Sequence, residues 1–309
     1  MRRRRAGTTR RCAAIVTMTL LVAMAGCDAD GDDEAPSPAA TSPSTVEGGG
    51  APSGGRVDVG GYELAYVCQG DGEPTVVLEA GYDSAGTSTF ADLLAPIAEE
   101  TRVCTYDRAG TGTSDPRPSA EGLTSADQAS ELRSLLEAAA IEPPYVLVGH
   151  SYGGFVARLF AAAYQDETAG LILIESSHED EIEPYRDHYG NDPAGDWVDG
   201  GDLLDIDATA DALRTTARNF GELPLVVIRA ETYEDVLSTS LWRRTQADLA
   251  TLSSNALYVV ADGSGHFVQD EAPEVVLAAI HEVLAASRAG SALPACEDVV
   301  ASIPASCPA

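Results

Sequence analysis

Short apolar runs rich in β-branched residues recur along the chain from about residue 60 onward. Such runs are typical of buried strands, and they lie at residues 62–68, 75–78, 102–106, 145–148, 171–174, 225–228 and 256–260. Between the later runs lie stretches with helical periodicity, at residues 124–140, 152–164, 241–252 and 273–286. Because strands that alternate with helices form a mostly parallel sheet covered on both faces, the pattern predicts an α/β fold. Its ligand site should lie at the carboxyl ends of the strands.

Two of the helical stretches carry recognisable start signals. Thr124 and Asp127 have the spacing of a capping box at the start of 124–140, and Pro273 opens 273–286. The alternation breaks between residues 176 and 223, a segment rich in Asp, Glu, Gly and aromatic residues. We expect this segment to be a cap inserted over the edge of the sheet, within a single domain of residues 56–290.

The first 55 residues are predicted to lie outside this domain. Arginines precede a short apolar run, residues 13–25, which leads into Met24-Ala25-Gly26-Cys27. The run is too short to span a bilayer, and small residues before a Cys are typical of signal-peptide cleavage, so residues 1–27 are interpreted as a signal peptide. They resemble a bacterial lipobox, which implies lipidation of Cys27 and anchoring to the membrane outside the cytoplasm; secretion without a lipid is the alternative. Residues 28–55 have the composition of a flexible linker.

The charge of the chain is strongly negative. All 19 basic residues are Arg, six of them precede Cys27, and the segment after Cys27 carries 13 Arg against 49 acidic residues, a formal charge of −36. Such a surface repels phosphate backbones, which argues against a nucleic-acid partner.

Four cysteines remain after Cys12 in the signal and Cys27 at the anchor are set aside: Cys68, Cys104, Cys296 and Cys307. Export implies an oxidising compartment, and the spacing is not that of a zinc site, so two disulfides are expected among three possible pairings. No metal or organic cofactor is implied.

The motif with the clearest chemistry is Gly149-His150-Ser151-Tyr152-Gly153, a G-x-S-x-G. It lies between an apolar strand and a predicted helix, the setting in which this motif makes a sharp turn that lifts the serine hydroxyl clear of the sheet. Ser151 is therefore predicted to be a nucleophile.

With this motif the chain resembles the α/β-hydrolase-fold enzymes over roughly residues 60–288. Three further segments carry the resemblance: Leu78-Glu79-Ala80-Gly81, Tyr106-Asp107-Arg108-Ala109-Gly110-Thr111-Gly112 and Gly263-Ser264-Gly265-His266. The resemblance implies an eight-stranded, mostly parallel sheet. It also implies that Cys68 pairs with Cys104 on neighbouring strands; Cys296 and Cys307 are then expected to close a small loop in a tail of residues 291–309.

The family carries its catalytic base in a Gly-rich loop after the last strand, and this loop holds His266. His150, His178, His188 and His281 have structural interpretations. The oxyanion hole is expected to use the backbone N–H of Tyr152 and one from the loop after the third strand, where Tyr82 is preferred to Gly81. Asp107 and Arg108 are expected to fix their turn by an ion pair and hydrogen bonds, with substrate contact as the alternative.

The triad acid departs from the commonest family pattern. The usual position, after the strand at 225–228, is occupied by Tyr233, and the nearby acids Glu231, Glu234 and Asp235 are out of register. By contrast, the strand at 171–174 is followed directly by Glu175, which resembles hydrolase-fold branches with the triad acid at this point. Glu175 is predicted to be the acid, with Glu231 second.

These residues predict a serine hydrolase that cleaves an ester-type bond of a small acyl substrate through an acyl-enzyme on Ser151. Two alternatives stay open. One is an amidase or peptidase of the same fold, and the other is a non-catalytic lipoprotein that uses the fold to bind a ligand.

Overall fold

The computed structural model describes residues 53–118, 122–189, 198–232 and 238–308. Within these residues, nine strands form one mixed sheet in the order β1-β2-β4-β3-β5-β6-β9-β10-β11. The strands are β1 (Ser53–Asp58), β2 (Glu63–Gln69), β3 (Thr75–Glu79), β4 (Val103–Tyr106), β5 (Tyr145–His150), β6 (Thr168–Ile174), β9 (Leu225–Ala230), β10 (Ala256–Ala261) and β11 (Ala305–Ser306). The run from β4 to β10 is parallel, whereas β1, β2 and β11 pair antiparallel. The α/β prediction is confirmed, with nine strands in place of eight.

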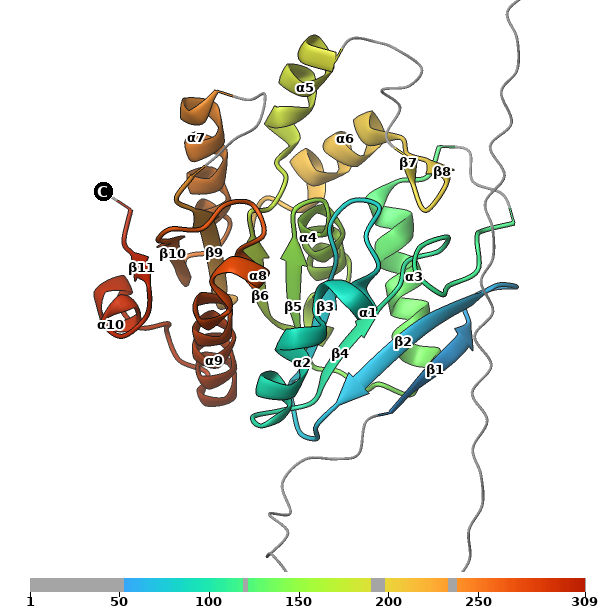
Figure 1. The fold of residues 1–309 in the computed structure, drawn as a ribbon, viewed down its shortest axis with the longest axis horizontal. Helices are drawn as coiled ribbons and strands as arrows, with labels where there is room; N and C mark the ends of the chain where they lie inside the picture. Colours follow the sequence, from blue (N-terminus) through green and yellow to red (C-terminus); the bar gives the residue numbers. More distant parts are fainter. Residues whose placement is uncertain (1–52, 119–121, 190–197, 233–237, 309) are drawn as a thin grey trace, which may run out of the picture. The chain divides into compact units, whose positions relative to one another are not determined.

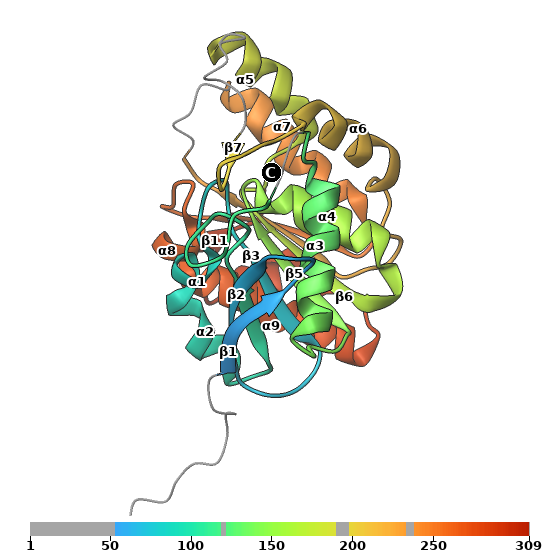
Figure 2. The same ribbon diagram turned by 90° about the vertical axis from the view of Figure 1, so that its right-hand side faces the viewer.

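Helices cover both faces of the sheet (Figures 1 and 2). One face packs against α3 (Ser125–Ala138) and α4 (Gly153–Ala163), and the other against α2 (Ala91–Ala98) and α9 (Pro273–Ala289). Helix α6 (Ile206–Thr216) packs on α3 and α4. The central strands are apolar on both sides: in β5, Leu147 faces the first layer, whereas Val146 and Val148 face the second. A strand buried on both faces needs such a continuous apolar run, which is why these strands could be recognised in the sequence.

The remaining helices are short or lie at the ends of strands. They are α1 (Gly86–Thr89), α5 (Ile182–Tyr189), α7 (Thr239–Leu249), α8 (Val268–Glu271) and α10 (Cys296–Val300). The capping box of α3 is present, since Thr124 accepts a hydrogen bond from the N–H of Asp127 and Asp127 accepts one from Thr124. Within the described parts of the chain, no helix is long and apolar enough to cross a membrane.

The segment expected to be a cap lies between β6 and β9. It contains α5, α6 and a hairpin of two short strands, β7 (Val198–Asp199) and β8 (Asp202–Leu203), which lie above the sheet in the view of Figure 1. The hairpin is tied to the start of α3, because the Leu123 N–H donates to the carbonyl of Leu203 and the Asp205 N–H donates to that of Leu123.

Both ends of the domain differ from the expected boundaries. The linker was expected to reach residue 55, but β1 begins at Ser53 and pairs with β2 through Ser53 to Asp58. At the other end, β11 adds to the edge of the sheet beside β10. The structure contains both expected disulfides: Cys68–Cys104 joins directly paired residues of β2 and β4, and Cys296–Cys307 closes the tail.

Candidate active site

The turn from β5 into α4 has the geometry of a nucleophile elbow. Ser151 has a φ of +53°, a left-handed conformation that is strained for a residue with a side chain. Its N–H donates to the carbonyl of Ile174 at 3.0 Å, which ties the elbow to the end of β6. Gly149 makes the turn possible, since a Cβ at this position would lie 2.7 Å from the carbonyl oxygen of Gly153. The half-buried Ser151 thus lies at the carboxyl end of the central strand, ahead of the N-terminus of α4.

His266 lies in the loop that follows β10, and residues of this loop hold it in place by hydrogen bonds. The N–H of Gly263 donates to Glu231 at 2.6 Å, and the N–H of Gly265 donates to Glu271 at 2.8 Å. The hydroxyl of Ser264 donates to the carbonyl of Ala261 at 2.9 Å. The imidazole itself is 42% exposed, so it can be approached by a ligand.

Glu175 directly follows β6 and faces this imidazole. Its Oε2 lies 3.5 Å from Nδ1 of His266, and its side chain is 1% exposed. The carboxylate also accepts the N–H of Ala230 at 2.7 Å and the indole N–H of Trp242 at 3.3 Å. Like Ser151, it has a positive φ, +45°. A buried, hydrogen-bonded carboxylate beside one ring nitrogen fixes the imidazole and leaves the other nitrogen, Nε2, for proton transfer.

Glu231, the second candidate for the acid, is placed differently. Its carboxylate accepts the N–H of Gly263 and so holds the backbone of the histidine loop. Tyr233, Glu234 and Asp235, which were considered in the same register, lie outside the described residues. The structure therefore brings Glu175 to His266 and gives Glu231 a contact with the loop.

His150, inside the elbow, is a neutral side chain. Burial, together with the neighbouring His266, lowers its pKa to about 3. Its Nε2 lies 3.0 Å from the backbone carbonyl of His266, and the two rings are 4.8 Å apart. This contact holds the loop that carries His266, which agrees with the structural interpretation of His150.

Two other histidines have structural contacts as well. His178 caps its own turn by accepting the N–H of Asp180, and the exposed His281 contacts Glu100. The side chain of His188 lies outside the described part.

The candidate oxyanion donors approach Ser151 from two elements. Tyr152 follows the nucleophile at the start of α4, and the loop of residues 80–84, here called the oxyanion loop, follows β3. Gly81 is close to the elbow, because a Cβ on it would lie 3.5 Å from Cβ of Ser151. The rings of Tyr82 and Tyr152 meet edge to face at 6.0 Å.

The turn after β4 is fixed by Asp107 and Arg108, both fully buried. Asp107 accepts the N–H of Thr87 and the N–H of Thr113, each at 3.0 Å. Arg108 forms ion pairs with Glu79 and Asp199 at 2.6 and 2.7 Å. The hydrogen bonds of Asp107 fix the turn as predicted, whereas the ion pairs of Arg108 join the turn to β3 and to the β7–β8 hairpin and not to Asp107.

Two residues at the site were not predicted from the sequence. Trp242, on α7, donates to the candidate acid, and Asp199, on the β7–β8 hairpin, pairs with Arg108. Trp242 is one of only two tryptophans in the chain, and its presence in an otherwise mostly polar helical segment is a signal that could have marked it. Asp199 lies among many other acids in the cap and carries no such signal.

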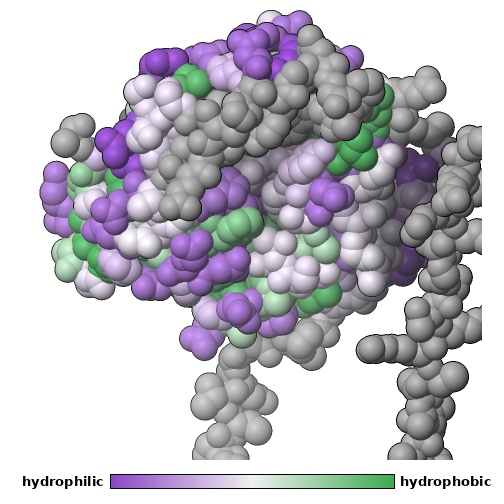
Figure 3. All heavy atoms as spheres, turned by 45° about the horizontal axis from the view of Figure 1, so that its top comes forward, coloured by the Kyte–Doolittle hydropathy of each residue, from purple (hydrophilic) through white to green (hydrophobic). Residues whose placement is uncertain are grey.

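Large apolar side chains are exposed at the edge of the candidate site. Among the described residues, Tyr82 is 38% exposed and Phe267, next to His266, is 52% exposed. On the face shown in Figure 3, hydrophilic residues cover much of the visible described surface, and apolar residues form small separate groups. The described residues contain no group of three or more His, Cys, Asp or Glu side chains that could hold a metal ion.

Comparison with known proteins agrees with this architecture. Residues 74–200 match a family profile described as the alpha/beta hydrolase fold. An uncharacterised Bacillus subtilis protein, YqjL, is 29% identical over 227 residues, which cover 71% of this chain and 87% of that protein. A Gibberella zeae protein named as an AB hydrolase superfamily protein is 31% identical over 115 residues, which cover 35% of this chain and only 34% of that protein.

Among solved structures, a thermophilic esterase from Thermogutta terrifontis has a TM-score of 0.58 at 22% identity, covering 76% of this chain and 99% of that one. A likeness at this identity establishes the fold. The architecture and the profile match over residues 74–200 show the α/β-hydrolase fold, and together they support a hydrolase.

Proposed function

We propose that this protein is a serine hydrolase that cleaves an ester-type bond through an acyl-enzyme on Ser151. One observation carries the proposal: Nδ1 of His266 lies 3.5 Å from Oε2 of the buried Glu175, beside an elbow that presents Ser151 at a φ of +53°. Nucleophile, base and acid come from the ends of β5, β10 and β6. Their chain order, Ser–Glu–His, differs from that of other serine hydrolase folds, but the roles are the same.

In the proposed reaction, Nε2 of His266 takes the proton of the Ser151 hydroxyl as its oxygen attacks the substrate carbonyl carbon. The tetrahedral oxyanion accepts hydrogen bonds from the N–H of Tyr152 and from the N–H of Tyr82 or Gly81. His266 then gives the proton to the leaving alcohol, and the C–O bond breaks. Water, deprotonated by the same imidazole, then attacks the acyl carbon. The bond to the Ser151 oxygen breaks, the imidazolium returns its proton to that oxygen, and the acid is released. Glu175 stabilises the imidazolium that forms in both halves of the reaction.

The surroundings of the site favour a neutral substrate with an apolar acyl or aryl group. Tyr82, within the oxyanion loop, and Phe267, next to His266, offer exposed apolar surface at the site. The chain carries a large excess of acidic residues, which disfavours anionic substrates.

The test is turnover of matched aryl esters and anilides with acyl chains of increasing length. We expect ester hydrolysis that Ser151→Ala reduces by at least about 1,000-fold without changing the melting temperature by more than a few degrees. Retention of ester turnover by Ser151→Ala would refute the nucleophile. Faster cleavage of the anilide than of its ester would favour an amidase or peptidase, and a folded chain inactive on all substrates would favour a ligand-binding role.

The proposal also includes the location of the enzyme outside the cytoplasm, attached to the membrane through a lipid on Cys27. The support is the lipobox-like sequence Met24-Ala25-Gly26-Cys27, which lies outside the described residues, and the disulfides Cys68–Cys104 and Cys296–Cys307. Disulfides persist in oxidising compartments.

A further inference from the structure

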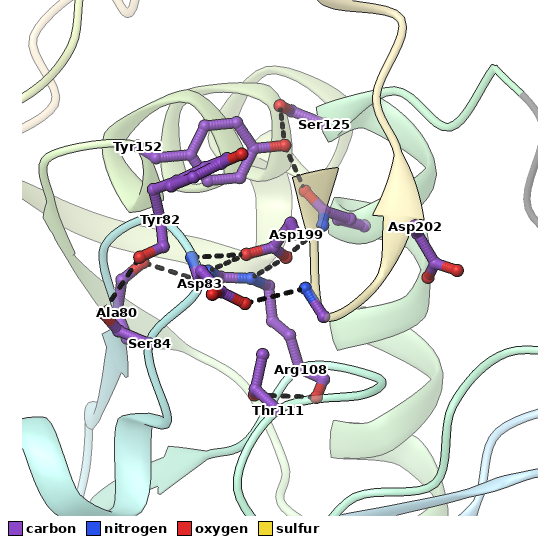
Figure 4. A network of polar contacts seen from close by, with 12 residues as sticks. Ala80, Tyr82, Asp83, Ser84, Arg108, Thr111, Ser125, Tyr152, Asp199 and Asp202 are labelled. Atoms are coloured by element: carbon purple, nitrogen blue, oxygen red, sulfur yellow. Dashed lines mark hydrogen bonds and ion pairs between the residues drawn. The ribbon is translucent and has the colours of Figure 1, made fainter. Parts of the chain in front are cut away.

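A buried polar network lies beside the oxyanion loop (Figure 4). Its centre is Arg108, 1% exposed, whose guanidinium contacts Glu79 on β3 at 2.6 Å and Asp199 on the β7–β8 hairpin at 2.7 and 2.8 Å. The hydroxyl of Tyr106 donates to Glu79 at 2.6 Å, and the side-chain amide of Gln128 donates to Asp199 at 2.9 Å. Burying two carboxylates and one guanidinium is costly unless each is well paired, and here every carboxylate oxygen accepts a hydrogen bond.

Arg108 also binds the backbone of the oxyanion loop. Its two terminal nitrogens donate to the carbonyl oxygens of Ala80 at 2.7 Å and Gly81 at 2.5 Å. In a trans peptide, the carbonyl of one residue and the N–H of the next point in opposite directions. The N–H groups of Gly81 and Tyr82 are therefore directed away from the guanidinium. These are the two candidate oxyanion donors of this loop.

The cap hairpin holds the same loop from its other end. The N–H of Asp83 donates to Oδ1 of Asp199 at 2.8 Å, and the N–H of Gly200 donates to Oδ1 of Asp83 at 3.3 Å. The hairpin also packs tightly on the turn after β4, since a Cβ on Gly110 or Gly200 would overlap the backbone of the other turn. A change in the position of the hairpin should therefore shift Arg108 and the oxyanion loop as well.

We propose that Arg108 and Asp199 are positioning residues: Arg108 orients the oxyanion-loop peptides toward the reacting carbonyl, and Asp199 makes that orientation depend on a docked cap. The inference rests on the proposed function, because it assigns these residues a role in stabilising the oxyanion on Ser151. It gives the cap a part in the chemical step in addition to any part in binding.

The test is Asp199→Asn, with Asp202→Asn as the matched control. In the Asp199→Asn variant, the amide group of the new side chain would face the donors of Arg108 and Gln128, so the guanidinium should shift from the loop carbonyls. Asp202 lies on the other strand of the same hairpin and points away from the network in Figure 4; it pairs instead with Arg117. The control therefore removes a comparable ion pair from the hairpin without touching the oxyanion loop.

For Asp199→Asn we expect kcat on an aryl ester to fall by about 10- to 100-fold with KM within about threefold, a fraction of what loss of a whole oxyanion donor costs. Inhibition by a boronic acid, which forms a tetrahedral adduct on the serine, should weaken by the same factor as kcat. Asp202→Asn should lower the melting temperature by a similar amount with kcat within about threefold. Arg108→Lys keeps the charge but cannot bind both carbonyls of the oxyanion loop, so it should lower kcat by a similar factor. If Asp199→Asn does not fold, Arg108→Lys serves as the test variant.

Unchanged kcat and boronate affinity in folded Asp199→Asn or Arg108→Lys would overturn the inference. Equal kcat losses in Asp199→Asn and Asp202→Asn would also overturn it, because they would reflect loosening of the whole hairpin. Failure of the proposed function looks different: the unmutated protein would neither turn over esters nor bind the boronate.

Discussion

Replacing Glu175 by Gln is the most informative change at the triad, because it removes a charge and keeps the shape. The carboxylate lies 3.5 Å from Nδ1 of His266, and it also accepts hydrogen bonds from the N–H of Ala230 and the indole of Trp242. A Gln at this position presents an amide group to one of these donors, so it no longer fixes the imidazole and no longer stabilises its cationic form.

The size of the effect follows from the geometry. Two unit charges 3.5 Å apart attract by about 5 kcal/mol at an effective dielectric constant of about 20. The 42% exposure of the His266 side chain reduces this figure through solvent screening. Since about 1.4 kcal/mol corresponds to a factor of ten in rate, we expect kcat to fall by about 100- to 10,000-fold. Loss of the acid's charge in serine proteases of known mechanism costs about 10,000-fold, at the upper end of this range.

The assay is initial-rate turnover of a short-chain aryl ester, with thermal melts to establish that each variant is folded. Glu231→Gln is the control, because Glu231 contacts the N–H of Gly263, and a Gln oxygen can still accept that hydrogen bond. We expect its kcat to stay within about threefold of the unmutated protein. Near-normal turnover in Glu175→Gln beside a collapse in Glu231→Gln would refute the assignment.

Three further predictions concern stability and location. Burial and nearby acids raise the pKa of Glu181 to about 7, so between pH 4.5 and 7 the folded state holds a proton that the unfolded state has lost, and stability falls as pH rises. In urea melts, the free energy of unfolding of Glu181→Gln should therefore rise by about 3 kcal/mol relative to that of the unmutated protein between pH 4.5 and pH 8. A difference between the two proteins that does not change with pH would contradict this. Removing the disulfide Cys68–Cys104, which spans 36 residues, should lower the free energy of unfolding by about 4 kcal/mol, and removing Cys296–Cys307, which spans 11, should lower it by about 3 kcal/mol. The reverse order would show that the chain entropy of the unfolded state does not set the difference. The full chain made in a bacterial host should partition into detergent, and Cys27→Ser should move it to the aqueous phase; an aqueous unmutated chain would contradict lipidation.

Local signals made much of the fold and of the candidate triad predictable from the sequence. The glycines around Ser151 mark the elbow, and continuous apolar runs mark β5 and β6. These elements could be predicted because their signals lie in residues that are adjacent in the sequence. Glu175 could be selected because it follows such a run directly. The start of α3 could be placed by Thr124 and Asp127 for the same reason.

The unpredicted parts depend on contacts between distant segments. Strand β1 has two glycines and is mostly exposed, so it lacks an apolar pattern; its place is set by pairing with β2, where a Cβ on Gly54 would lie 2.6 Å from the carbonyl of Tyr66. The pairing of Asp199 with Arg108 joins residues 91 positions apart. Nothing near Asp199 in the sequence distinguishes it from the other acids of the cap.

The role of Ser151 as nucleophile is tested by locating the covalent adduct formed with a fluorophosphonate ester, by mass spectrometry of peptides from the labelled protein. We expect one equivalent of label on the peptide that contains Ser151. We also expect no labelling of Ser151→Ala, and labelling slowed by at least about 100-fold in His266→Ala, because without its base the serine hydroxyl is a weak nucleophile. A folded, unlabelled chain, or label on a residue other than Ser151, would contradict this role.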